Sequence, residues 1–530
     1  MKYRKRKLRK FYFHPITIFI FLTFLVMFLS GIFTAFQMQA TYDVVNKVTG
    51  ELEPTLVTVE NLFNFYGINF LISSASKNFI SFAPLGMLLI SMIGISVAEA
   101  SGFIEALTKR HLRKVPKNVL TFLIILLATF SSLINEIGYV ILIPLVASIY
   151  LINKRNPILG IITAFCGVAY GYGVSLFIGS MEVSLIPYTT SAAYLIDPNT
   201  HISLMSNLFF IIFTSIALSI AGTFVIEKFI APKLGKYKDE EEITKTLELE
   251  YIDREKQEQI KLERDHNEKR GLRYALITAI ILICAFIYML IPGLPRSGLL
   301  LDMNQKTYLN QLFGEASYFQ DGFTYLICLI FLTMGIAYSV GSRKFKNDRQ
   351  IIESASKTFS NLGSVIILIF VIAQFISVFK KTNIGTVITA WLANLLNYLN
   401  FSGIALIVVV ILIIAVANLF VTTPAAKWAI FSPVVVPMLM QSNISAPFAQ
   451  AIMRAGDSLT NGLTPLLAGF AIYLGFLNIY NLNKDKPIGI RKAISYTVPY
   501  FWFTALIWIF IIIAWYLVGL PIGPGVYPTI

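Results

Sequence analysis

Apolar runs of about 20 residues recur along most of the chain, and they restrict its fold more than any other feature. A run of this length can cross a lipid bilayer as a single α-helix. Of the 530 residues, 56% are hydrophobic and only 14% are charged, and the mean hydropathy is +0.70. The sequence therefore predicts an all-α polytopic membrane protein whose main partner is the lipid bilayer.

The positive charge of the chain indicates its orientation in the membrane. The net charge is +14 at neutral pH, and the basic residues gather in short loops between apolar runs. Such loops usually lie in the cytoplasm. This rule predicts a cytoplasmic N-terminus and an external C-terminus, with no nucleic-acid partner. We expect the membrane to be a bacterial cytoplasmic (inner) membrane. The basic segments are 1–10, 109–117, 153–155, 342–349 and 483–492.

Nine spans and two hairpins that do not cross the membrane satisfy this orientation. Residues 118–151 have basic loops at both ends, so we expect them to enter from the cytoplasm and return to it. Residues 404–440 leave and rejoin the outside, so the two re-entrant hairpins are inverted relative to each other. The predicted spans lie near 16–36, 82–107, 157–188, 206–229, 273–293, 322–341, 358–379, 447–480 and 494–519.

A short motif is duplicated inside two of these apolar segments. The stretch from Gly173 to Gly179 recurs from Gly456 to Gly462, each time after a hairpin with a polar tip. Polar residues interrupt a membrane helix only where the freed backbone groups face protein, water or an ion. A duplicated pair of broken helices marks the midplane binding site of a secondary transporter. The motif therefore predicts a transporter core built from inverted repeats.

The segments then group into a core and a scaffold. The predicted core repeats are residues 118–188 and 404–480, each a hairpin followed by a broken helix. A hydrophilic cytoplasmic insertion, 231–273, has interspersed charges typical of a solvated linker rather than a regulatory domain. The scaffold comprises the N-terminal spans 1–107, the spans 206–400 that contain this insertion, and the last span with its tail, 494–530.

Few ionisable residues lie deep in the interrupted segments. They are Glu136, Glu182, Arg454 and Asp457, and a charge at that depth costs several kcal/mol, so each is a functional candidate. Arg454 and Asp457 are three residues apart, so we expect them to pair along one helix face. Glu136 could instead be solvated at a hairpin tip, and Glu182 could face an aqueous vestibule.

Oxygen-bearing side chains gather at the hairpin tips and helix breaks. Such hard ligands suit Na⁺, although Ser and Thr also cap half-helices or bond the preceding turn. Asn418 is an amide inside an apolar arm and needs hydrogen-bond partners. Trp428 could stack on an aromatic substrate or anchor the chain at the membrane interface. The candidate contacts are Ser131, Ser132, Asn135, Glu136 and Ser175 in the first half and Thr422, Thr423, Ser458, Thr460 and Asn461 in the second.

No enzyme motif is present in the sequence. It contains no Gly-x-Ser-x-Gly elbow, no phosphate-binding loop and no His-Glu-x-x-His pair. The three cysteines and four histidines are scattered singly, which argues against a disulfide framework and a zinc site. We therefore expect no catalytic residues and no cofactor other than a coupling ion, either Na⁺ or H⁺.

Two signatures in the second half resemble the p-aminobenzoyl-glutamate transporter (AbgT) family. The first runs from Asn418 through Ala-Lys-Trp428-Ala-Ile-Phe-Ser-Pro433, and the second from Arg454-Ala-Gly-Asp457 to Thr-Pro465. The first half agrees at Gly94–Glu105 and Gly138–Pro144. The resemblance implies an ion-driven homodimer that moves p-aminobenzoyl-glutamate or related folate precursors, and sulfonamide efflux is linked to the family. The positions that match the family's transport pathway are Asn418, Trp428, Arg454, Asp457 and Pro465.

The resemblance implies a role for three of these residues. Arg454 would meet a substrate carboxylate, Trp428 would stack on its benzoyl ring, and Asp457 would relay protons or ligate a cation. Uptake and efflux remain open, as do a Na⁺-coupled carrier of a dicarboxylate or other organic anion, a channel, and a membrane receptor or scaffold. The chain departs from the family pattern at Asn135-Glu136 (usually Ser-Asp), Glu182 (usually Asp), Ala425 (usually Ser) and Gly462 (usually branched and apolar).

Overall fold

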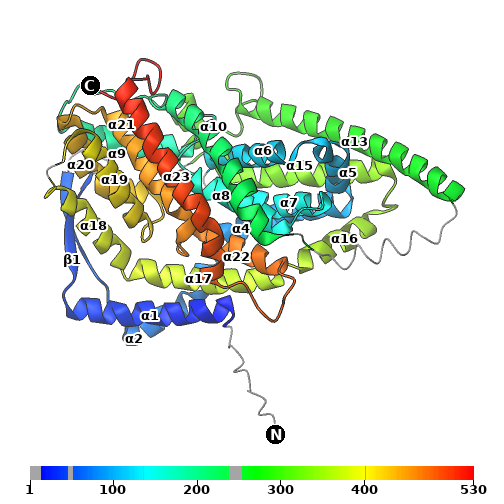
Figure 1. Cartoon of the computed structure of the whole chain (residues 1–530), viewed down its shortest axis with the longest axis horizontal. Coiled ribbons are helices and arrows are strands. Elements are labelled where there is room, and N and C mark those ends of the chain that lie inside the picture. Colours follow the sequence, from blue (N-terminus) through cyan, green and yellow to red (C-terminus); the bar gives the residue numbers. More distant parts are fainter. Residues whose placement is uncertain are drawn as a thin grey trace, which may run out of the picture.

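The computed structural model describes a largely helical chain (Figure 1). The described residues are 13–45, 52–134, 136–235, 237, 254–314, 316–399 and 401–530, without the side chains of 45 and 254–264. Within these ranges, nine helical segments are long and apolar enough to cross a bilayer, which agrees with the predicted polytopic fold. They are Pro15–Ala35, Ala83–Ala100, Lys117–Ile134, Leu208–Leu234, Asp265–Leu290, Tyr318–Ser342, Gly363–Lys381, Ala446–Ile479 and Ile490–Val518.

All but one of these segments fall on predicted spans. The exception is Lys117–Ile134, which the sequence predicts to be the first arm of a hairpin. Conversely, the predicted span 157–188 forms two helices, α8 (Pro157–Tyr170) and α9 (Ser180–Ala193), with a break between them. At 1.5 Å per residue neither helix alone reaches across the apolar layer. The predicted helix break is therefore present in the structure.

The two halves of the core repeat the same order of elements, namely helix, tip, helix, helix, break and helix. The first repeat consists of α6 (Lys117–Phe130), η2 (Ser131–Ile134), α7 (Ile137–Ile152), α8 and α9. The second consists of α19 (Gly403–Asn418), α20 (Pro424–Gln441), α21 (Ala446–Leu459), η4 (Asn461–Leu463) and α22 (Ala468–Ile479). We call 171–179 the first break and 460–467 the second break.

The two core repeats pack against each other in a reciprocal way. Helix α20 packs on α9, and α7 packs on α22. The second arm of each hairpin therefore lies against the far half of the other repeat's broken helix. Within each repeat, the first arm packs on the near half of its own broken helix, α6 on α8 and α19 on α21. Each repeat thus completes the core of the other.

The N-terminal part of the scaffold adds a small β-sheet to the helices. Strands β1 (Gln39–Val45) and β2 (Leu52–Thr58) pair antiparallel, and β1 contacts α18 and α20. This sheet lies in the loop predicted to be outside. Next to it, α1 (Pro15–Ala35) packs along α17, at the lower edge of Figure 1. The neighbouring helices are α2 (Phe65–Ser73), α3 (Ala75–Ile80), α17 (Gly363–Lys381) and α18 (Ile384–Leu396).

Helices α4 (Ala83–Ala100), α13 (Arg254–Leu290) and α15 (Tyr318–Ser342) pack together through small residues. A Cβ on Gly341 would lie 2.7 Å from the Cα of Gly271, and one on Gly335 would lie 2.9 Å from the Cα of Ala98. Apolar surface alone gives little drive for helix association in lipid, so such close backbone approach is what holds membrane helices together. We call these three helices the glycine-packed trio.

The remaining helices and the C-terminal tail pack around the elements described so far. The C-terminal tail is tied back to the bundle, because the amides of Phe209 and Phe210 both bond the Ile522 carbonyl, at 2.9 and 3.1 Å. Helix α23 lies beside α10 (Figure 1). These elements are α5 (Phe103–Arg110), η1 (Leu112–Lys114), α10 (Leu208–Val225), η3 (Ile226–Ile230), α11 (Ala231–Leu234), α14 (Tyr308–Phe313), α16 (Asp348–Ser360) and α23 (Ile490–Val518).

Candidate functional site

The two copies of the duplicated motif touch each other in the middle of the core. The Gly173 amide of the first break donates to Ser458 Oγ on α21 at 2.9 Å. A Cβ on Gly173 would lie 2.7 Å from that Oγ and 3.0 Å from the Arg454 Cβ, so only glycine fits there without a shift. The predicted contact candidate Ser458 therefore joins the repeats.

Arg454 pairs with Glu182 across the two repeats. Arg454 Nη1 lies 2.8 Å from Glu182 Oε1, and both side chains are buried, at 1% and 6% exposure. The same Nη1 donates to the Gly173 carbonyl at 3.1 Å. Glu182 Oε2 accepts from the Gly179 amide at 2.7 Å, at the positive N-terminal end of α9. The pair thus links α21 with both sides of the first break.

A second buried ion pair lies within the second repeat. Lys427 on α20 pairs with Asp457 on α21, and both side chains are fully buried. Lys427 also donates to Asn418 Oδ1 at the end of α19. Lys427 was not among the predicted site residues, because it stands next to a predicted polar tip. A lysine within an apolar arm is itself the signal that could have identified it.

The predicted pairing of Arg454 with Asp457 is wrong. The two residues share helix α21, but Arg454 turns toward the first repeat and Asp457 toward α20. A pairing along one helix contributes only about 0.2–0.5 kcal/mol. An unpaired buried charge costs far more, so the partners on neighbouring elements decide the arrangement.

Amides and hydroxyls bind the second break to its surroundings. Asn418 Nδ2 donates to the Asp457 carbonyl at 2.8 Å, to Asn461 Oδ1 at 2.9 Å and to Thr460 Oγ1 at 3.1 Å. Asn461 Nδ2 donates to the Ala169 carbonyl of α8 at 3.2 Å. Side chains thereby satisfy backbone groups that the break frees. Three of the predicted site residues, Asn418, Asp457 and Asn461, meet here.

Trp428 is enclosed between the repeats. Its indole nitrogen donates to Thr189 Oγ1 of α9 at 2.8 Å, and its side chain is fully buried. Gln450 of α21 donates to the same oxygen at 3.2 Å and accepts from Arg454 Nη2 at 3.4 Å. Thr189 and Gln450 were not among the predicted site residues, although both are polar residues within apolar helices and could have been identified by that.

The other predicted tip residues have mixed surroundings. Ser131 donates to the Ala128 carbonyl at 2.6 Å, which is the local bonding that the sequence left open. Ser132 bonds the Thr129 carbonyl at 2.7 Å and also the Val174 carbonyl of the first break at 2.8 Å. Ser175 Oγ is buried without a hydrogen-bond partner in the described part of the chain. Glu136 is half-buried at the start of α7, and Asn135 lies outside the described residues.

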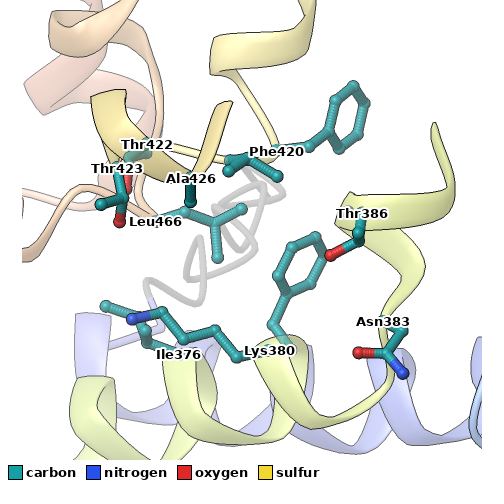
Figure 2. A pocket seen from close by; sticks show the side chains of 12 residues that line it. Ile376, Lys380, Asn383, Thr386, Phe420, Thr422, Thr423, Ala426 and Leu466 are labelled. Atoms are coloured by element: carbon teal, nitrogen blue, oxygen red, sulfur yellow. The ribbon is translucent and has the colours of Figure 1, made fainter. Parts of the chain in front are cut away.

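Thr422 and Thr423 lie apart from the ion pairs. They line an open cavity of about 250 Å³ between the tip of the second hairpin and helices α17 and α18 (Figure 2). Pro465 precedes Leu466, which lines the same cavity. The lining residues are Ile376, Phe379, Lys380, Asn383, Gly385, Thr386, Phe420, Val421, Thr422, Thr423, Ala426 and Leu466.

Among the described residues, the core carries four buried charges, and each has a partner of opposite sign; we call this arrangement the closed core. Two broken helices face each other across matched charges, inside a bundle of membrane-crossing helices. Such an arrangement is typical of secondary transporters. Fold and site define the class as a multi-span membrane transporter.

Comparison with known proteins identifies the family. The model of the AbgT putative transporter family matches residues 8–530, and the chain belongs to this family, as its sequence signatures indicated. The chain is 30% identical over 518 residues to the p-aminobenzoyl-glutamate transport protein of Escherichia coli (strain K12), covering 98% of this chain and 94% of that protein.

Two solved structures are also similar to the chain. The YdaH transporter of Alcanivorax borkumensis is 28% identical, with a TM-score of 0.47 and coverage of 96% of this chain and 100% of that one. MtrF of Neisseria gonorrhoeae, described as illuminating a class of antimetabolite efflux pumps, is 30% identical, with a TM-score of 0.48 and 98% coverage of both chains.

Proposed function

We propose that the protein is an ion-coupled secondary transporter of p-aminobenzoyl-glutamate or of related folate-precursor or sulfonamide-like compounds. The observation that carries this proposal is the buried Arg454–Glu182 pair, which joins the two core repeats. A guanidinium binds carboxylates through a fork of N–H donors, so a substrate carboxylate can take the place of Glu182. Kinship with the p-aminobenzoyl-glutamate transport protein of E. coli supports this substrate class.

The closed core suggests how substrate would drive the cycle. In the structure, Arg454 is held by Glu182 and Trp428 is held by Thr189. A substrate that replaces Glu182 on Arg454 favours the open core by the difference in its affinity for the two states. Separation of α9 from α20 then frees the indole ring of Trp428 to stack on an aromatic substrate.

The coupling ion acts, in this proposal, at the Lys427–Asp457 pair. A proton on Asp457 would release Lys427 from its carboxylate partner. Alternatively, Na⁺ would take the place of the Lys427 ammonium among the oxygens of Asp457, Asn418 and Thr460. Both ions would act at the Lys427–Asp457 pair, so flux must be measured with proton and sodium gradients imposed separately to tell the two mechanisms apart.

We further propose a homodimer in the bacterial cytoplasmic membrane, with the core repeats 118–188 and 404–480 moving against the remaining helices. Both hairpins would be re-entrant, from opposite sides. Single cysteines test this topology in a variant without native cysteines, with a membrane-impermeant thiol reagent on intact cells. Cysteines at Ser402 and Gln441 should react from outside, whereas cysteines at Lys114 and Lys154 should react only after the cells are opened. The reverse pattern at either hairpin would contradict its proposed entry side.

Flux in proteoliposomes tests the function. Purified protein is reconstituted, and uptake of labelled p-aminobenzoyl-glutamate and of a sulfonamide is followed with proton and sodium gradients imposed separately. We expect accumulation with one gradient, which collapses when an ionophore dissipates it. Asp457→Asn, checked for normal folding, should lose this accumulation. Folded wild-type protein without flux under either gradient would contradict the substrate class. Dicarboxylates would then be tested, since Glu136 and Glu182 are longer than the aspartates usual in the family.

A further inference from the structure

The cavity at the second hairpin tip lies outside the buried charge network. One wall comes from α17 and α18 and includes Lys380 and Thr386, and the opposite wall is the tip itself, with Thr422 and Thr423 (Figure 2). Leu466 of the second break closes one side. Every wall of this cavity except α17 and α18 therefore belongs to the second core repeat, and a molecule bound here touches both the tip and the break.

Two adjacent lysines at the end of α17 have different surroundings. Lys381 pairs with Glu60 at 2.9 Å. Lys380 forms no ion pair among the described residues, and its side chain extends along the cavity beneath Thr423 and Leu466 (Figure 2). Its ammonium can therefore pair with an anion that enters the cavity.

The other lining groups suit an anion that carries a ring. The hydroxyls of Thr422 and Thr423 make no hydrogen bond within the described part of the chain, so both can donate to a ligand. Helix α20 begins at Pro424 without a side-chain cap, and its N-terminal end adds partial positive charge to the same wall. Phe379 and Phe420 supply aromatic surface.

We propose that this cavity is an access site for an organic anion with an aromatic ring. Lys380 binds the carboxylate, Thr422 and Thr423 donate hydrogen bonds to it, and the ring lies against Phe379 and Phe420. This inference rests on the proposed function, because it supplies the substrate with a first binding place beside the closed core. A residue at such a site contributes to the binding of the substrate, so its replacement should change KM rather than kcat.

Transport kinetics of Lys380→Ala test the site, with Lys381→Ala as the matched control. We expect Lys380→Ala to raise KM for p-aminobenzoyl-glutamate about tenfold, since a hydrogen bond to a charged group is lost, with kcat within about twofold of wild type. Lys381→Ala should leave KM unchanged. An unchanged KM in Lys380→Ala, or equal changes in both variants, would overturn the proposal.

Equilibrium binding separates this proposal from the transport proposal. Titration calorimetry with p-aminobenzoate needs no flux, and sulfanilamide serves as an analogue without a carboxylate. We expect Lys380→Ala to weaken p-aminobenzoate binding about tenfold and to leave sulfanilamide binding unchanged. Wild-type protein that binds p-aminobenzoate through Lys380 but never transports it would support the site while contradicting the proposed function. Binding that is absent in wild type, or identical in Lys380→Ala, would overturn the site.

Discussion

Trp428 donates its indole N–H to Thr189 Oγ1 at 2.8 Å, and this bond joins the second hairpin to the far half of the first broken helix. The oxygen also accepts from Gln450, so a single hydroxyl serves two donors from two different helices. In the closed core, Trp428 is thus part of the contact that holds the two repeats together. In the proposed mechanism, its ring would become available to substrate only when this contact breaks.

Replacing Thr189 with valine keeps the shape of the side chain but removes the shared acceptor. We expect the free energy of unfolding to fall by about 1–3 kcal/mol, because the Trp428 and Gln450 donors stay buried without a partner. Thermal unfolding in detergent measures this effect. Ser191→Ala on the same helix is the control, since its hydroxyl is exposed and bonds only the Pro187 carbonyl. Equal melting temperatures for Thr189→Val and the control would contradict the bond's importance.

Removing either member of the Arg454–Glu182 pair should abolish transport. We expect Arg454→Ala to lower the free energy of unfolding by about 3–5 kcal/mol, since Glu182 stays buried without its cation. Glu182→Gln keeps the size of the side chain, and it should also lose transport, with a smaller effect on stability. Flux assays on variants that elute as folded protein test the pair. Wild-type flux in both variants would rule out a role for this pair in substrate binding.

The Lys427–Asp457 pair should behave as one unit. Lys427→Met and Asp457→Asn each leave a buried charge without its partner, and each should cost about 3–5 kcal/mol of stability. The double variant removes both charges, so it should recover most of the melting temperature but not the ion-driven flux. A double variant whose loss equals the sum of the single losses would mean that the two side chains do not interact.

Alanine at Gly173 should disturb the contact between the two breaks. Its Cβ would lie 2.7 Å from Ser458 Oγ, so we expect a loss of about 1–3 kcal/mol, partly relieved by Ser458→Ala. The control is Gly322→Ala in α15, where a Cβ meets nothing within 4 Å. Melting temperatures of the three variants check this prediction. A loss in Gly322→Ala as large as that in Gly173→Ala would argue for a general effect of glycine replacement.

Hydropathy and the duplicated motif predict the membrane helices and the two breaks, because both depend on local sequence. Hydropathy alone does not separate Lys117–Ile134, predicted as a hairpin arm, from the other long apolar helices. The β1–β2 sheet was likewise not predicted from the sequence.

Sequence spacing did not predict which residues form ion pairs within the site. Arg454 and Asp457 stand three residues apart, yet each pairs with a residue of another helix. The rotation of α21 about its axis decides this, and the packing between the repeats sets that rotation. Lys427 within an apolar arm is a signal that the sequence does give, but the enclosure of its ammonium depends on the position of α20 between α9 and α21.

The glycine-packed trio has a consequence for genetic screens. At Gly341 and Gly335 the backbones of neighbouring helices meet so closely that any larger residue must push the helices apart. Damage there should appear as degraded protein in the cell, with normal kinetics in the few molecules that assemble. Core-charge variants that keep most of their stability, such as Glu182→Gln or the Lys427→Met, Asp457→Asn double variant, should instead leave abundant but inactive protein. Sorting inactive variants by cellular abundance would then separate positions that are needed for assembly from positions that are needed for activity.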